Sequence, residues 1–375
     1  MKKVMLTVLS VLFLVGVVSS AVAQESTIKF KPYGFIKLDM AYDEARTNNG
    51  NYVFWVDNGS DIAGNSEFNM TARQTRLGAN ISYDDLDDKV VTARFEFDFY
   101  GGGAENKNMP MLRHGFVKVD FGKYYLIAGQ SSDIFSPLVP TTVNYTVLWN
   151  CGNIGYRHPQ FQFGYKTDYG LEIVSALSRN ISGDFDNDNN DDGENSSMPT
   201  IQARFSYLTS KMNVGLSGHF GEMKFTQLDN CKRCDSYSVN AHGSYSFMEA
   251  FQIKGEVFSG RVLDQYLGGI GQGFDIASGK GINSRGGWIN AGFKASQNVS
   301  FNLGFGIDKL NDNDEMVLPF RSSNRSIFGN IFTKIAYNTT LAMEVSQWTT
   351  SYNNNDSIDT DSSNTRFHIS FIHSL

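Results

Sequence analysis

The sequence predicts an all-β chain, a transmembrane antiparallel up-and-down β-barrel of about 16 strands with one constriction loop folded inward. The 375 residues include 29 Phe and 17 Tyr, yet mean hydropathy is only −0.29. Polar and apolar residues alternate in many short stretches, and no apolar stretch after residue 23 approaches the roughly 18 residues of a spanning helix. Short and long connections alternate between these stretches. Together these features favour strands that separate lipid from water.

The first 23 residues are predicted to be a secretory signal peptide. Two lysines precede the apolar run Val4 to Val18, and Ala21-Val22-Ala23 is a small-x-small cleavage site. A membrane-anchor helix is the alternative, but the run is short for one. Residues 24–375 then form the barrel. Removal of the two lysines takes the formal net charge from −7 to −9, which argues against a nucleic-acid partner.

The stretch TARFEFDFY, residues 92–100, shows the alternation most clearly. Successive side chains of a strand point to opposite faces, so its Phe residues share one face and its charged residues the other. A soluble sandwich also alternates, but it has no reason to sort its connections by length. A membrane barrel has short periplasmic turns and long external loops. We therefore expect Phe95, Phe97 and Phe99 to face lipid and the charged residues to face a water-filled bore.

One long connection, residues 131–156, differs from the others. It carries less charge, contains Pro137 and Pro140, and includes apolar residues such as Phe135 and Trp149. A loop of this composition should fold against something, and we expect it inside the barrel as a constriction. An extracellular cap is the alternative. In the inward arrangement, Asp133 would line the narrow zone.

Basic residues on the polar face of the predicted strands are candidates for lining the pore. Arg and Lys around a narrow bore select for anions, because low-dielectric walls focus the field. Arg also binds carboxylates and phosphates through two parallel hydrogen bonds. Inward acids such as Glu96 leave a salt-bridged wall as the alternative for each single residue. The candidates are Lys37, Arg73, Arg76, Arg94, Arg113, Lys118, Arg157, Arg204 and Lys254, with Asp133 in the loop.

The three cysteines do not form a disulfide framework. Cys231 and Cys234 form a C-x-x-C pair, for which we predict a local loop disulfide, because a zinc site needs about four ligands and no second pair exists. Cys151 stands alone. The acidic segment 183–195 is predicted to be a solvated external loop. Calcium binding is the alternative, but Pro199 occupies the position where an EF-hand-type loop has Glu.

No catalytic motif is present, so we expect no enzyme, no metal and no cofactor. The sequence favours an outer-membrane porin for passive diffusion of small hydrophilic, preferably anionic solutes, surrounded by the lipid and lipopolysaccharide of a bacterial outer membrane. One alternative is a barrel whose external loops act in adhesion or receptor binding. Another is an outer-membrane hydrolase, which would need a Ser/His constellation on the outer rim.

Several stretches in the first half of the mature chain resemble DcaP-like outer-membrane porins: ARQTRLG, RFEFDFYGGG, MLRHGFVKV, IAGQSSDIF and RHPQFQ, in similar order. The second half matches only in strand rhythm. The resemblance implies a homotrimer with an arginine-rich lumen that takes up small anionic solutes such as dicarboxylates and aromatic acids. The segment with Cys151 departs from the family pattern. As lumen or constriction residues the resemblance implies Arg73, Arg76, Arg94, Arg113 and Arg157.

Overall fold

The computed structural model describes most of the chain after residue 27. The described residues are 28–59, 65–84, 89–103, 106–180, 183–184, 192–194, 196–227, 230–275, 279–311, 320–353 and 359–375. The predicted signal peptide lies outside these ranges. Within them, no helix is both long and apolar enough to cross a membrane.

The described residues form a 17-stranded antiparallel sheet and a small separate hairpin. The sheet strands are β1 (Ile28–Asp43), β2 (Glu67–Thr71), β3 (Arg76–Asp84), β4 (Val90–Asp98), β5 (Met111–Asp120), β6 (Tyr124–Ser132), β7 (Arg157–Lys166), β8 (Leu171–Ser178), β9 (Thr200–Leu208), β10 (Met212–Gln227), β11 (Asn230–Phe247), β12 (Phe251–Arg261), β15 (Asn283–Lys294), β16 (Val299–Leu310), β17 (Phe320–Ala336), β18 (Thr339–Asn353) and β19 (Asp359–Ser374). Between β12 and β15 lie the 3₁₀ turns η1 (Asp264–Tyr266) and η2 (Gly269–Gly271) and the hairpin β13 (Phe274–Asp275) and β14 (Lys280–Gly281).

The sheet closes into a barrel because its first strand pairs with its last. β1 pairs with β19 from Phe35 to Asp43 on one edge. On its other edge, the first half of β1 pairs with β3 and the second half with β2. β2 and β3 are therefore two parts of one crossing, and the barrel has 16 crossings, as predicted. Closure pairs the backbone groups of the strand edges, as hydrocarbon requires.

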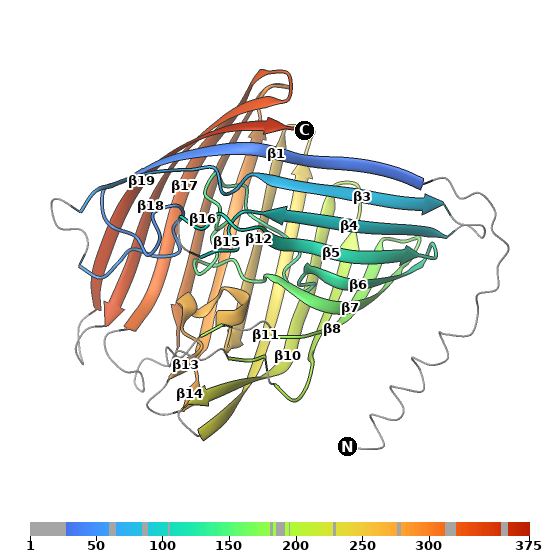
Figure 1. The fold of residues 1–375 in the computed structure, drawn as a ribbon, viewed down its shortest axis with the longest axis horizontal. Coiled ribbons are helices and arrows are strands. Elements are labelled where there is room, and N and C mark those ends of the chain that lie inside the picture. The colour runs from blue at the N-terminus through green and yellow to red at the C-terminus, as the bar shows by residue number, and fades with distance from the viewer. Residues whose placement is uncertain are drawn as a thin grey trace.

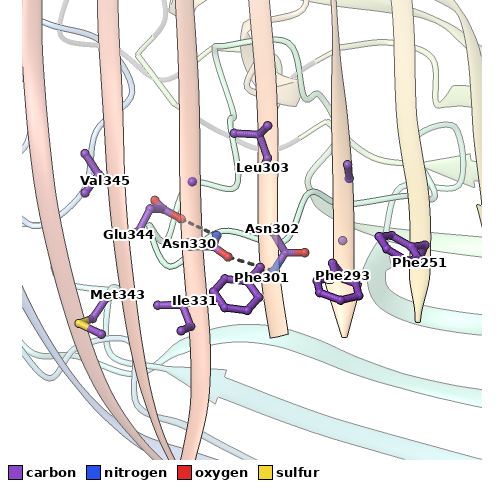
Figure 2. Close-up of a pocket in the computed structure, with 13 residues that line it drawn as sticks. Phe251, Phe293, Phe301, Asn302, Leu303, Asn330, Ile331, Met343, Glu344 and Val345 are labelled. Carbon is purple, nitrogen blue, oxygen red and sulfur yellow. Dashed lines mark hydrogen bonds between the residues drawn. The ribbon is translucent and has the colours of Figure 1, made fainter. Parts of the chain in front are cut away.

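Side chains alternate between the two faces of the barrel wall as expected. Phe95 is 52% exposed on the outside, whereas Glu96 and Asp98 are 6% and 0% exposed and face inward. The same division holds on the opposite side of the barrel. There, Asn302 and Asn330 belong to a hydrogen-bonded chain that ends at Glu344 on β18 (Figure 2). The barrel thus has an apolar exterior and a polar interior.

The strands fall into two walls of different length. The short wall, β3–β9, has strands of 8–10 residues. The tall wall, β10–β12 and β15–β19, has strands of 11–18 residues. Figure 1 shows the blue-green and green strands of the short wall on one side and the yellow to red strands of the tall wall on the other.

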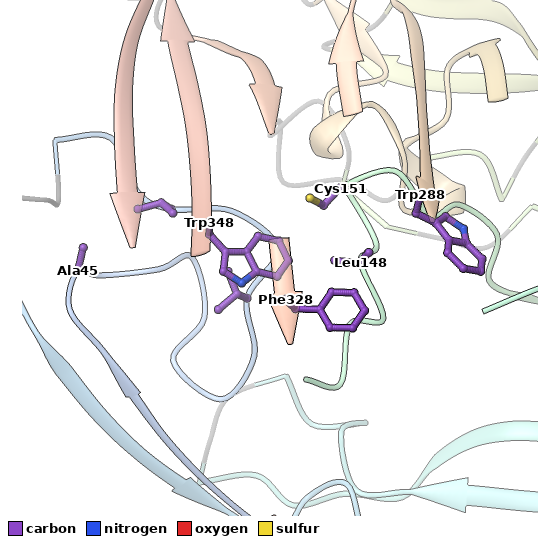
Figure 3. Close-up of a cluster of buried hydrophobic side chains, with 8 residues drawn as sticks. Ala45, Leu148, Cys151, Trp288, Phe328 and Trp348 are labelled. Carbon is purple, nitrogen blue, oxygen red and sulfur yellow. The ribbon is translucent and has the colours of Figure 1, made fainter. Parts of the chain in front are cut away.

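In the described part of the chain, three connections rather than one pack inside the barrel. Besides the inward loop (residues 133–156), the β1–β2 segment (residues 45–57) and the β12–β15 segment (residues 262–275) contribute fully buried side chains, including Val56 and Tyr266. In Figure 3, residues of the inward loop and the β1–β2 segment meet aromatic residues of the tall wall. Only the segment 131–156 was expected to fold inward, so sequence reasoning did not reveal the inward packing of these two additional segments.

Candidate functional site

The inward loop is held along the inner face of the tall wall by hydrogen bonds. Two buried carboxylates provide the main anchors: Glu256 accepts from the Leu138 N–H over 2.8 Å, and Glu344 accepts from the Val143 N–H over 2.7 Å. Further bonds join Ser136 Oγ to Glu256 at 2.5 Å, Thr141 N to Asn290 Oδ1 at 2.9 Å, Asn330 Nδ2 to Thr141 O at 2.8 Å, Lys254 Nζ to Thr141 Oγ1 at 2.9 Å and Lys37 Nζ to Val143 O at 3.0 Å. The anchors come from four strands of the tall wall and from the neighbouring β1, so the loop is fixed across the width of the wall.

Asp133 clamps the two ends of the inward loop together. Its N–H donates to the Tyr156 carbonyl over 3.0 Å, and its carboxylate accepts from the Tyr156 N–H over 2.8 Å. Gln202 and His158 also contact the carboxylate, at 2.8 and 2.9 Å. Burial alone would raise the pKa of Asp133, but His158 and these hydrogen bonds hold it below its usual value. Asp133 borders the pore cavity, yet its carboxylate is engaged in closing the loop.

Near its tip, the inward loop touches the strand backbone directly. A Cβ added to Gly152 would lie 2.1 Å from the Gly287 carbonyl oxygen of β15, so only glycine fits there. Cys151 is fully buried, with its Sγ 3.5 Å from the Gly306 carbonyl oxygen. Val147 adopts φ of 46°, a left-handed conformation that β-branched residues rarely adopt. Packing of Val147 against the aromatic cluster of Tyr100, Tyr145 and Trp149 must hold that conformation.

A cavity of about 560 Å³ lies between the inward loop and the short wall. The two sides of this cavity differ in chemistry. The short wall supplies mainly cationic and polar side chains, whereas the loop supplies apolar and aromatic ones. From the short wall come Arg76, Arg113, His114, Arg157, Gln162 and Arg204, and from the loop come Ser136, Leu138, Val139, Tyr145, Val147, Trp149 and Tyr156.

Most of the cavity arginines are paired with acids. Arg113 Nε lies 2.9 Å from Glu96, and its Nη1 lies 2.6 Å from Asp98 and 3.2 Å from the Tyr145 hydroxyl. Arg76 Nε lies 3.6 Å from the same Glu96. On β9, Arg204 makes a similar pair, 2.8 Å from Glu172. For these three arginines, the structure agrees with the alternative that inward cations form salt bridges within the barrel wall.

Arg157 differs from the other cavity arginines because it has no acidic partner within the described part of the chain. Its guanidinium lies 4.2 Å from the centre of the Tyr156 ring and 5.7 Å from that of Trp149. It is only 5% exposed, and among the described residues its Nε and Nη2 have no hydrogen-bond partner. This guanidinium is buried, stacks on aromatic rings and borders a cavity. It can therefore bind an anion through its unused donors.

The remaining predicted cations lie outside this cavity. Lys37 and Lys254 hold the inward loop, as described above. The other three bind groups of the short wall or of its connections. Arg73 donates to the carbonyl oxygens of Phe99 and Gly103, Arg94 donates to Asn80 Oδ1 over 2.9 Å, and Lys118 lies 2.7 Å from Asp120.

The predicted Cys231–Cys234 disulfide is contradicted by the structure. Both residues belong to the continuous strand β11, where they pair with Thr226 and Met223 of β10. Cys234 is a free, buried thiol, and the side chain of Cys231 lies outside the described part. Residues three apart on a strand point to opposite faces and lie roughly 10 Å apart, too far for a disulfide. The error came from placing these residues in a loop.

Sequence reasoning missed the anchors of the inward loop. Glu256 and Glu344 were recognisable as inward-facing acids, but nothing local to either strand indicates that its partner is a loop backbone. The additional inward segments did carry a signal: NYVFWV, residues 51–56, is as apolar as the inward loop. Among the described residues, no group of three or more His, Cys, Asp or Glu side chains could hold a metal ion. Most of the acidic segment 183–195 lies outside the described ranges.

Comparison with known proteins supports this architecture. The model of the DcaP outer membrane protein family matches residues 18–238. The outer membrane channel DcaP of Acinetobacter baumannii has a TM-score of 0.77 at 15% identity, covering 94% of this chain and 100% of its own. An anion-selective porin from Comamonas acidovorans has a TM-score of 0.63 at 12% identity. The trimer form of in-vitro folded OmpT of Vibrio cholerae has a TM-score of 0.59 at 11% identity. Both comparisons cover 94% of this chain and 100% of the other. No curated protein matches the sequence.

Proposed function

Since the chain belongs to the DcaP outer membrane protein family and has the porin fold of a bacterial outer-membrane channel, we propose that it lets small hydrophilic solutes diffuse passively, with a preference for anions such as dicarboxylates. The observation that carries the anion preference is the guanidinium of Arg157, which borders the cavity and has no acidic partner among the described residues. Arg76 and Arg204 line the same cavity, but each is paired with an acid, Glu96 and Glu172 respectively.

The inward loop supports a constriction at this level. Its two carboxylate anchors, Glu256 and Glu344, lie on the tall wall, and its opposite side borders the cavity that the arginines of the short wall line. A solute passing between the two meets cations on one side and aromatic or apolar groups on the other. An anion can exchange part of its hydration shell for arginine donors there, whereas a cation meets only repulsion from the uncompensated charge.

We also propose that the protein assembles as a homotrimer. A structural relative, OmpT of Vibrio cholerae, is described in a trimer form. The mass of the purified protein–detergent complex, corrected for detergent by light scattering, tests this assembly. A mass equal to one chain would contradict it.

The anion preference is tested by the zero-current potential of single channels in a salt gradient. We expect the wild-type potential to shift toward the anion equilibrium potential. Arg157→Gln should lower the anion-to-cation permeability ratio by roughly fivefold, the factor that about 1 kcal/mol of Coulomb energy gives. Lys118→Gln is the matched control, because it removes a short-wall charge that is paired with Asp120 outside the cavity. Cation preference in the wild type, or equal effects of both substitutions, would refute the proposal.

A further inference from the structure

Three cations stand together on the outer face of the tall wall, near its extracellular end. Arg285 on β15 lies directly opposite Lys309 on β16. Arg325 on β17 lies opposite Ile307, which places it diagonally next to Lys309. All three side chains are exposed and share the outward face with Ile289. We call Arg285, Lys309 and Arg325 the basic rim.

Within the described part of the chain, the basic rim lacks an acidic partner for two of its three charges. Residues directly opposite on antiparallel strands have Cβ atoms roughly 5 Å apart, and like charges in this position repel. Arg325 lies 3.3 Å from Asp361, so one charge of the rim is compensated. Within the described part of the chain, Arg285 and Lys309 form no ion pair. Two adjacent cations without an acid on a membrane protein surface favour an anion from the surroundings as the missing partner.

Directly below the basic rim, the wall is apolar. Outward-facing Ile289, Phe305 and Ile327 are 53%, 39% and 51% exposed. Further down the same strands lies a shallow hollow of about 540 Å³, bordered by Leu303, Met343 and other residues (Figure 2). Leu303 is six residues from Lys309, roughly 20 Å along a tilted strand. The hollow therefore begins near the middle of a hydrocarbon core about 30 Å thick.

We propose that this face binds a phosphorylated, multiply acylated glycolipid of the lipid A type from the outer leaflet. Its phosphate lies over Arg285 and Lys309, where the Arg fork donates two hydrogen bonds and the Lys ammonium adds a point charge. Its acyl chains cover the apolar positions below the basic rim and reach the hollow. The apolar belt distinguishes this ligand from free phosphate, and the basic rim distinguishes it from a neutral lipid or an apolar protein surface.

Native mass spectrometry of the full-length protein in detergent, titrated with bisphosphorylated lipid A, tests the proposal. We expect saturable binding of lipid A to the wild type. The affinity of the triple variant Arg285→Gln/Lys309→Gln/Arg325→Gln for lipid A should be lower by roughly tenfold or more. The matched control removes three charges at the periplasmic end of the barrel, Lys211→Gln/Lys294→Gln/Lys334→Gln, and should bind as the wild type does. A third variant, Arg285→Lys/Arg325→Lys, keeps the charges and should retain most of the affinity.

Two further ligands distinguish the contribution of the phosphorylated headgroup to binding from that of the acyl chains. Dephosphorylated lipid A should bind as weakly as the triple variant binds the intact lipid, and inorganic phosphate alone should not compete at millimolar concentration. Equal binding by the wild type and the triple variant, or equal binding of the dephosphorylated lipid, would overturn the proposal. The proposal would also be overturned if the triple variant bound lipid A normally and differed from the wild type only in the loss of association between copies of the chain. Circular dichroism of each variant verifies that the barrel has folded.

Discussion

The two walls of the barrel use their inward-facing polar residues for different purposes. On the short wall, arginines alternate with acids, and the cavity arginines face open space. On the tall wall, Glu256 and Glu344 face inward too, but both carboxylates bind the backbone of the inward loop. The difference shows that inward orientation alone does not make a residue part of the pore. What matters is whether its hydrogen-bonding capacity is already filled.

The comparison also explains how one cation can dominate a cavity that contains several. Arg113 has two acids within 2.9 Å, whereas Arg157 has aromatic rings and no acid among the described residues. A compensated arginine contributes little net field, because its charge is balanced locally. The uncompensated one contributes its full charge to a confined space. We therefore expect Arg113 to determine stability and Arg157 to determine selectivity.

The largest effect is expected from Arg113→Gln. Removing this guanidinium leaves Glu96 and Asp98 inside the wall without their shortest ion pairs, which should cost roughly 3–5 kcal/mol of stability. The temperature at which the folded band disappears in unboiled gel electrophoresis measures the loss. Arg94→Gln is the control, because Arg94 donates to an amide rather than to a carboxylate and should cost much less. Equal losses of stability in the two variants would show that the ion pairs of Glu96 and Asp98 with Arg113 do not stabilise the barrel.

Loosening the inward loop should have the next largest effect. Glu344→Ala removes the acceptor of the Val143 N–H and of the Asn330 amide, and each unsatisfied buried group costs roughly 1–3 kcal/mol. We expect a lower unfolding temperature together with larger and noisier single-channel conductance. Asn302→Ala is the control, because it also contacts Asn330 but not the loop. If Glu344→Ala leaves conductance unchanged, the loop does not limit the pore.

A smaller effect concerns Asp264 in the β12–β15 segment. Burial raises the pKa of this carboxyl to about 7, although the Gln265 N–H donates to it. Between pH of about 4 and 7, the folded protein keeps a proton that the unfolded chain releases, so stability falls as pH rises through this window. Asp264→Asn should flatten that fall, as measured by thermal circular dichroism from pH 4 to 8. The exposed Asp168→Asn should not, and an unchanged slope in Asp264→Asn would contradict the assignment.

The barrel itself was predictable because its signal is local. Alternation within TARFEFDFY already separates Phe95 from Glu96, and the order of short and long connections fixes the closed topology. The Cys231–Cys234 prediction failed because the tall-wall strands extend further than the alternation suggested, so that β11 includes both residues. Strand length beyond the membrane depends on pairing with a neighbour, which a single stretch of sequence does not reveal.

The site was predictable only as a group of cations. Four of the predicted cations line one cavity: Arg76, Arg113, Arg157 and Arg204. Which of them is paired with an acid depends on which strands are neighbours. Arg113 reaches both Glu96 and Asp98 because β4 and β5 pair with a register shift at Glu96. That shift, like the positions of the two additional inward segments, is a property of the assembled barrel. The pairing that leaves Arg157 without an acid could not be read from its own segment.

The most direct test of the central claim exchanges the charge at position 157 in an otherwise intact channel. In Arg157→Cys, a positively charged thiol reagent should restore the anion preference seen in the zero-current potential, and a negatively charged reagent should shift the potential toward cations. The described native thiols, Cys151 and Cys234, are buried, and the unsubstituted channel treated with the same reagents is the control. If neither reagent changes the potential of Arg157→Cys, the uncompensated charge does not set selectivity.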